Sequence, residues 1–176
     1  MAAAIGDMQF LEDSEDQAQF LTQVLSEDTL ASSGKRYVVW SSVMASRNRA
    51  LADFAAQLTD AVPDEEKRDI RFALSRMAVT NPYFFSRNFA QVNAGGSLDV
   101  LHMRDFQSIQ VHDEIGYHYA CIAISMVNGG YNCFRSHVSS LQQLGESDDA
   151  IDQAMRITSA LMAVRQAMFT QDQWGA

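Results

Sequence analysis

Apolar residues recur three and four positions apart along most of this chain, and this spacing constrains the fold more than any other feature. The clearest case shows spacings of four, three and four residues, at Ile115, Tyr119, Ile122 and Met126. Such spacing places side chains on one face of an α-helix, whereas a half-buried strand alternates apolar and polar residues. Only two prolines and nine glycines interrupt the 176 residues. The sequence therefore predicts an all-α fold in which the helix over 115–126 is central and buried.

Helix ends are marked by prolines, glycines and acidic residues. Proline and acids are favoured in a first turn, and a glycine often follows a last turn. The Asn81-Pro82 pair is predicted to end one helix and begin the next, and the loop 93–97 is predicted to separate two halves of the chain. Together with the apolar periodicity, these signals predict helices over 15–26, 36–46, 47–61, 63–79, 83–92, 131–144 and from 147 onward.

The chain is predicted to form one domain with a weak internal repeat. An acidic N-terminal segment, 1–34, carries seven acids and no Lys or Arg, and we expect it to pack on a single helical domain, 35–176. Residues 36–92 and 112–170 follow a similar order of helices, and Met-Ala-Val recurs in both with the same spacing to a phenylalanine. This pattern favours a duplicated helical unit.

Composition excludes several classes of protein. The net charge of −9 argues against nucleic acid binding, which requires a basic surface. No apolar run approaches the ~20 residues that cross a bilayer, and residues 1–10 lack the basic start and apolar stretch of a signal peptide. Two cysteines are too few for a disulfide framework and fit a reducing compartment. We therefore expect a cytoplasmic protein with neither nucleic acid nor membrane as a partner.

Cys133 and His137 are the strongest candidates for chemistry. They follow the pair Gly129-Gly130, which is suited to opening a helix. Cys133 would then lie in or near a first turn, where the positive end of the helix dipole favours a thiolate. Residues four apart share a helix face, so His137 can contact Cys133 and share its proton. Spacing alone also fits an inert buried cysteine.

The remaining cysteine and histidines give weaker signals. Cys121 lies on the apolar central helix and is interpreted as a core residue; the alternative is a disulfide with Cys133, for which bridge geometry is demanding. Glu114 precedes His118 by one helical turn, so the two form either a carboxylate–imidazole relay or an ordinary surface pair. The four histidines lack the spacing of metal ligands, and we expect no metal site.

The segment around Cys133 carries a family resemblance. Asn-Gly-Gly-Tyr-Asn-Cys-Phe-Arg-Ser-His at 128–137, followed by Leu141, Leu144-Gly145 and an acidic helix start, resembles alkylhydroperoxidase D of the carboxymuconolactone decarboxylase-like superfamily. The likeness is strongest over 114–169 and extends weakly over 38–89. It implies an all-helical protomer in a homotrimer or other assembly. It also implies thiol-based peroxide reduction with no bound cofactor, and electrons from a peroxiredoxin-linked partner or a lipoyl-type donor.

The chain departs from the family pattern at two positions. That pattern is Cys-x-x-Cys-x-x-x-His, with an acidic residue twelve positions before the first cysteine. Cys133 and His137 match the second cysteine and the histidine, whereas Gly130 stands at the first cysteine and His118 at the acid. A disulfide cycle within the motif is therefore impossible, and an external thiol would have to resolve an oxidised Cys133.

Three functions remain open at this stage. The first is an alkylhydroperoxidase D-like peroxide reductase, in which Cys133 attacks the peroxide and His137 moves the proton. The second is a non-catalytic helical assembly or interaction protein of the same family, favoured by the missing cysteine. The third is a decarboxylase-like enzyme that uses His137 or His118 to transfer a proton on a small organic acid.

Overall fold

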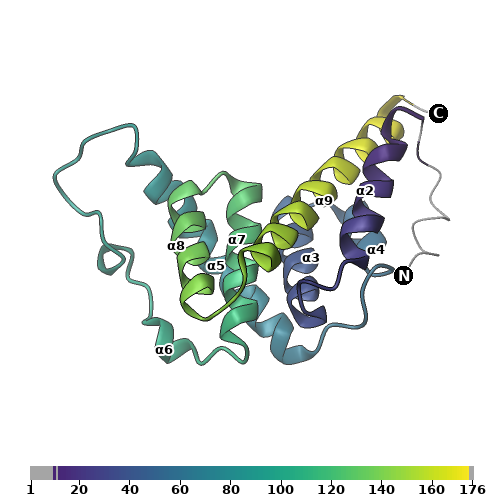
Figure 1. The fold of residues 1–176 in the computed structure, drawn as a ribbon. Helices are drawn as coiled ribbons and strands as arrows, with labels where there is room; N and C mark the ends of the chain where they lie inside the picture. Colours follow the sequence, from purple (N-terminus) through teal and green to yellow (C-terminus); the bar gives the residue numbers. More distant parts are fainter. Residues whose placement is uncertain (1–9, 11, 175–176) are drawn as a thin grey trace.

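The computed structural model describes residues 10 and 12–174, and within them it contains only helices and connecting loops. The all-α prediction is therefore confirmed. The α-helices are α2 (Glu15–Ser26), α3 (Ser32–Ser46), α4 (Arg49–Ala55), α5 (Asp64–Ser86), α6 (Phe106–Ile109), α7 (Glu114–Asn128), α8 (Tyr131–Gln143) and α9 (Asp148–Trp174). Two short 3-10 turns are η1 (Glu12–Ser14) and η2 (Asp99–Leu101). Figure 1 shows α5, α7 and α8 grouped on one side of the molecule, and α2 beside α9 on the other.

Helix α7 is the central element of the fold, as its apolar periodicity predicts. It packs against α3, α5, α8 and α9. Ten of its residues, from Gly116 to Ser125, are buried without interruption. A helix that is covered on all sides in this way needs apolar residues around its whole circumference, which this sequence supplies.

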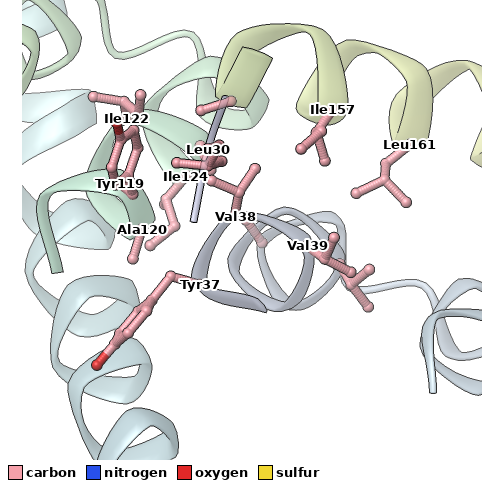
Figure 2. Packing of buried hydrophobic residues seen from close by; sticks show 14 of the residues in the cluster. Leu30, Tyr37, Val38, Val39, Tyr119, Ala120, Ile122, Ile124, Ile157 and Leu161 are labelled. Carbon is pink, nitrogen blue, oxygen red and sulfur yellow. The ribbon is translucent and has the colours of Figure 1, made fainter. Parts of the chain in front are cut away.

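The main core lies where α3 meets α7 and α9 (Figure 2). Helix α3 contributes Tyr37, Val38 and Val39, each with 0% of its surface exposed. Facing residues from α7 and α9 are equally buried: Tyr119, Ala120, Ile122, Ile124, Ile157 and Leu161. The aromatic and aliphatic stripes of the sequence are thus packing surfaces.

The start of α7 is fixed by a buried carboxylate. Asp69 has no exposed surface, and it accepts hydrogen bonds from the Tyr37 hydroxyl at 2.9 Å and from the backbone N–H groups of His112 and Asp113 at 3.0 Å. Asp113 in turn caps α7 by accepting the N–H of Gly116 at 2.9 Å. A buried charge is tolerated when several donors satisfy it. This network sets the position of the helix that carries His118.

The predicted break at Asn81-Pro82 is wrong, because α5 continues through Pro82 to Ser86. Proline removes one helical hydrogen bond and leaves the carbonyl of the residue four positions earlier without its partner. That residue is Ala78, and both it and Pro82 are exposed, so water can satisfy the freed carbonyl. The proline is therefore tolerated, and no separate helix forms over 83–92.

Two other helix boundaries differ from the prediction. Helix α3 begins at Ser32, four residues before the predicted start at 36, and the helix predicted over 47–61 is shortened to α4. Arg47 has a left-handed backbone with φ of 53°, which ends α3, and Asn48 then caps α4 by accepting the N–H of Leu51 at 2.9 Å. Asparagine in this position stabilises a helix start by supplying an acceptor to a free N–H group.

The acidic N-terminal segment is joined to the domain by a fully buried glutamine. Residues 1–9 and 11 of the segment lie outside the described part of the chain. Gln153 of α9 donates hydrogen bonds to the carbonyl groups of Val24 and Glu27 at 2.8 Å and accepts the N–H of Leu30 at 2.6 Å. Arg156 binds the Glu27 carboxylate with two hydrogen bonds of 2.7 Å. The turn between α2 and α3 is thus fastened to α9.

The helix order is similar in the two halves of the chain. A 15-residue helix is followed by a shorter one and then by a long one, both in α3–α4–α5 and in α7–α8–α9. The duplication itself stays a prediction. Among the described residues, no helix is both long and apolar enough to cross a membrane.

Candidate functional site

The Gly129-Gly130 pair separates the buried helix α7 from α8, which carries Cys133, as predicted, and α8 packs against α7. Gly129 has a φ of 71°, a left-handed conformation that glycine adopts without strain. The N–H of Gly130 donates to the carbonyl of Ser125 at 2.8 Å, which closes the turn. Cys133 then lies in the first turn of α8 with 8% of its surface exposed.

His118 and His137 form a hydrogen-bonded pair across α7 and α8. Their Nδ1 atoms lie 2.8 Å apart, although the residues are 19 positions apart in the sequence. A contact of this length requires one ring to donate its Nδ1 proton and the other to accept it. The structure therefore brings together two of the candidate residues and joins them through a shared proton.

Both imidazoles are neutral at pH 7. Burial and, to a smaller extent, the electrostatic effects of His118 and Arg76 together lower the pKa of His137 to about 3. Burial also lowers the pKa of His118, and the Glu114 carboxylate partly opposes this shift. Neutral imidazoles can both give and accept a proton, which a permanently charged pair cannot do.

Cys133 and both histidines line one cavity of ≈ 390 Å³. Its apolar walls come from α5, α6 and the long connection between them: Met77, Phe84, Leu98, Met103 and Phe106. The Phe106 ring stacks on His118 with centroids 5.8 Å apart and planes at 23°. Cavities of this size, apolar with a few converging polar groups, are typical of small-molecule sites. A thiol, a proton-sharing pair and an apolar chamber therefore meet at one place.

Comparisons with known proteins found several relatives that share one name. No family model matches the chain. Alkyl hydroperoxide reductase AhpD of Mycolicibacterium paratuberculosis is 26% identical over 135 residues, covering 74% of this chain and 75% of the relative. AhpD of Anaeromyxobacter dehalogenans is 29% identical over 147 residues, covering 81% and 77%, and AhpD of Caulobacter vibrioides is 28% identical over 117 residues, covering 65% and 62%. The resemblance to AhpD is confirmed.

The observed geometry differs from the AhpD-like pattern in the partner of His137. The four-residue spacing predicts that His137 contacts Cys133. The Nδ1 atom of His137 instead faces His118, and among the described residues no hydrogen bond joins the Cys133 thiol to His137. His118, which stands at the family's acid position, thus forms a hydrogen bond directly with His137, which stands at the position of the family's histidine.

Glu114 does not complete a tight relay with His118. The nearest atoms, Glu114 Oε1 and His118 Nε2, are 3.8 Å apart, and the Glu114 side chain is half exposed. This distance is too long for a hydrogen bond, so Glu114 acts on His118 mainly through the electrostatic effect of its carboxylate, which favours the protonated ring. Neither sequence interpretation describes the pair in full, because the distance is long for a relay and His118, with 8% of its surface exposed, is not a surface residue.

Asn81 occupies the space of the missing AhpD cysteine. A Cβ atom added at Gly130 would overlap the side-chain amide of Asn81. Asn81 is 1% exposed, donates a hydrogen bond to the Ser125 hydroxyl at 3.0 Å and accepts one from Asn128 at 3.2 Å. The glycine and the buried asparagine are therefore complementary in space. The sequence contains no local signal for this pairing, because Asn81 and Gly130 are far apart along the chain.

Cys121 lies in the core, as predicted, with none of its surface exposed. Burial raises the pKa of its thiol, and nearby Arg76 only partly opposes this effect. A buried neutral thiol is a poor nucleophile. Within residues 10 and 12–174, no three His, Cys, Asp or Glu side chains are positioned to hold one metal ion. A second cavity, of ≈ 480 Å³, is lined by Trp40, Met44, Leu74 and neighbouring residues and includes neither cysteine.

The neutral histidine pair should make the protein sensitive to mild acid. The ordinary pKa of histidine is 6.5, whereas that of His137 in the fold is about 3. Between these values the unfolded chain binds the proton and the folded chain does not, so the free energy of unfolding falls as the pH falls. We expect His137 alone to account for a loss of about 2 kcal/mol between pH 7 and pH 5.

Urea unfolding at both pH values measures this loss. In His137→Gln the difference between pH 7 and pH 5 should shrink, because the titrating ring is gone. The control is His102→Asn, which replaces an exposed histidine and should leave the difference unchanged. Equal pH dependence in the wild type and His137→Gln would contradict the prediction.

Proposed function

We propose that this chain is an AhpD-like, thiol-dependent peroxide reductase with Cys133 as its reactive thiol. The observation that carries the proposal is the meeting of Cys133, His118 and His137 in one largely apolar cavity. The names of the similar proteins support the same class of reaction. The reaction belongs to antioxidant defence.

In the proposed reaction the Cys133 thiolate attacks the terminal oxygen of the peroxide. A sulfur–oxygen bond forms, the oxygen–oxygen bond breaks, and the leaving alkoxide takes up the proton that the Cys133 thiol lost on forming the thiolate, which gives an alcohol. Sulfur loses two electrons and the peroxide gains them. We assign the proton transfer to His137 with His118 as its partner, because the two neutral rings share a proton at 2.8 Å.

Reduction of the oxidised thiol requires a second sulfur from outside the motif. An external thiol condenses with the Cys133 sulfenic acid, which releases water and leaves a mixed disulfide. A second thiol, or the other sulfur of a lipoyl-type dithiol, then frees Cys133 and leaves as a disulfide. We further propose a homotrimer and a peroxiredoxin or lipoyl-protein partner, on the AhpD resemblance alone, and a cytoplasmic location stays a prediction.

One observation favours the alternative, a non-catalytic family member. Asn81 fills the space that a thiol at position 130 would need, so the fold is adapted to the absence of the first cysteine. Such a chain would keep the helical assembly and lose the reaction. Oxidation of Cys133 distinguishes the two functions.

A brief exposure to peroxide in the presence of a sulfenic-acid trap tests the proposal. We expect mass spectrometry to find the trap on the peptide that contains Cys133, with Cys121 unmodified and no disulfide between them. The adduct should be absent in Cys133→Ser. A folded wild-type protein that shows no adduct on Cys133 would favour the non-catalytic alternative.

A further inference from the structure

Arg76 is a cationic side chain in the cavity that the proposed reaction leaves unused. It projects from α5, is partly buried and lines the cavity together with Cys133 and His137. Its Nη1 atom donates a hydrogen bond to the carbonyl of Arg104 at 2.9 Å. Among residues 10 and 12–174, no carboxylate lies within ion-pair distance of it; the acids that pair with arginines do so with Arg36, Arg49, Arg68 and Arg156.

An arginine in such a place normally has an anionic partner. Burial of a charge costs free energy unless an opposite charge or several hydrogen bonds compensate it. The guanidinium presents a planar set of donors that matches the two oxygens of a carboxylate. The Arg104 carbonyl and the neighbouring Tyr117 hydroxyl use only part of this set, so Arg76 has donors left for a ligand.

The remaining lining of the cavity limits what that ligand can be. Among the described residues that line the cavity, Arg76 is the single Lys or Arg, and none is an Asp or a Glu. Both imidazoles are neutral, because burial lowers the pKa of each ring and Arg76 lowers that of His137 further. The other walls are mainly Met, Phe and Leu side chains. The cavity thus offers one positive group and a large apolar surface.

We infer that this cavity binds a medium-chain organic acid, with its carboxylate on Arg76 and its chain against the apolar walls. The peroxide that reaches Cys133 is then a hydroperoxide of such an acid, in preference to hydrogen peroxide or a neutral alkyl hydroperoxide. This second statement rests on the proposed function; the binding of the carboxylate does not. Arg76 is accordingly a residue that determines substrate specificity.

The test of binding uses decanoate and its neutral methyl ester, with no peroxide present. In calorimetry on the full-length reduced protein, decanoate should bind more tightly than methyl decanoate. Arg76→Gln should weaken decanoate binding about 10- to 100-fold, which is the contribution of a charged hydrogen-bonded pair, and leave the ester unchanged. Arg76→Lys keeps the charge and should lose less affinity.

Two controls keep this result interpretable. Arg135→Gln removes an exposed arginine of α8 that does not line the cavity, and it should bind decanoate like the wild type. Circular dichroism checks that Arg76→Gln is folded; if it is not, Arg76→Lys supplies the comparison. Equal binding of acid and ester by the wild type would overturn the inference, as would tighter binding of decyl phosphate than of decanoate.

The rate at which hydroperoxides oxidise Cys133 tests this inference separately from the proposed function. Hydroperoxydecanoate should label Cys133 faster than its methyl ester in the wild type and at the same rate as the ester in Arg76→Gln. If decanoate binds through Arg76 and neither hydroperoxide oxidises Cys133, the proposed function fails and the binding site stands. If both hydroperoxides oxidise Cys133 equally in the wild type, the proposed function stands and the specificity of Arg76 is wrong.

Discussion

Replacing Gly130 with cysteine, which would restore the AhpD pattern in the sequence, is expected to destabilise this protein. The new Cβ would overlap the buried Asn81 side chain, which cannot move without breaking its hydrogen bond to Ser125. Overpacking of a filled core commonly costs about 1–3 kcal/mol. Thermal or urea unfolding of Gly130→Cys should show a loss of that size, and Gly130→Ala should show a similar one because it introduces the same Cβ.

A second substitution should convert this loss into a gain of function. Asn81→Ala opens the space beside position 130, at the cost of about 1 kcal/mol for each hydrogen bond lost. The double variant Gly130→Cys with Asn81→Ala should therefore be more stable than the sum of the two single changes predicts. On oxidation it should form a disulfide between the introduced thiol and Cys133, detected as a mass decrease.

Peroxide reduction with a dithiol donor should then be faster in the double variant than in the wild type. A neighbouring sulfur makes the resolving step intramolecular, which raises its effective concentration by several orders of magnitude. Asn81→Ala alone is the matched control and should not raise the rate. If Gly130→Cys by itself is as stable as the wild type, Asn81 moves cheaply and the proposed complementarity of the two positions is wrong.

The largest effect on turnover is expected at Cys133. Cys133→Ser removes the proposed nucleophile and should lower the rate of peroxide reduction on the order of 10³-fold or more. Cys121→Ala should change it little, because Cys121 is fully buried and its pKa is raised. Alanine is the better control than serine here, since a serine would leave a hydroxyl group in the core.

The measurement is the initial rate of peroxide loss with an added thiol, after both variants have been shown to be folded. Retention of the rate in Cys133→Ser would contradict the proposed function. A large loss in folded Cys121→Ala would instead assign the core thiol a part in the reaction.

The local features of the fold could be predicted from the sequence, whereas the contacts between distant helices could not. Helix α2 has the predicted bounds, and α7 is buried as its periodicity indicates, because both depend on residues three and four apart. The Asn81-Pro82 prediction failed because the cost of a proline depends on whether water reaches the freed carbonyl. Exposure of that carbonyl is a property of the whole fold.

The same limit applies to the candidate site. The family pattern around Cys133 identifies His118 and His137 as candidates. The contact between their Nδ1 atoms, however, depends on how α7 and α8 pack. From the sequence alone, Asn81 is placed only at a predicted helix end and Arg76 is given no role, because both lie on α5, more than fifty positions before Cys133 in the sequence. A signal for Arg76 is the helical spacing that puts Arg76, Thr80 and Phe84 on one side of α5, and all three line the cavity.

The attachment of α2 through Gln153 has a consequence for shortened forms of the protein. Gln153 is fully buried, and its amide is satisfied by three backbone groups between Val24 and Leu30. A chain trimmed to begin at α3 would leave this amide in an apolar layer without its partners. Activity lost on trimming would therefore report damage to the folded core, and would not by itself assign a recognition role to the acidic N-terminus.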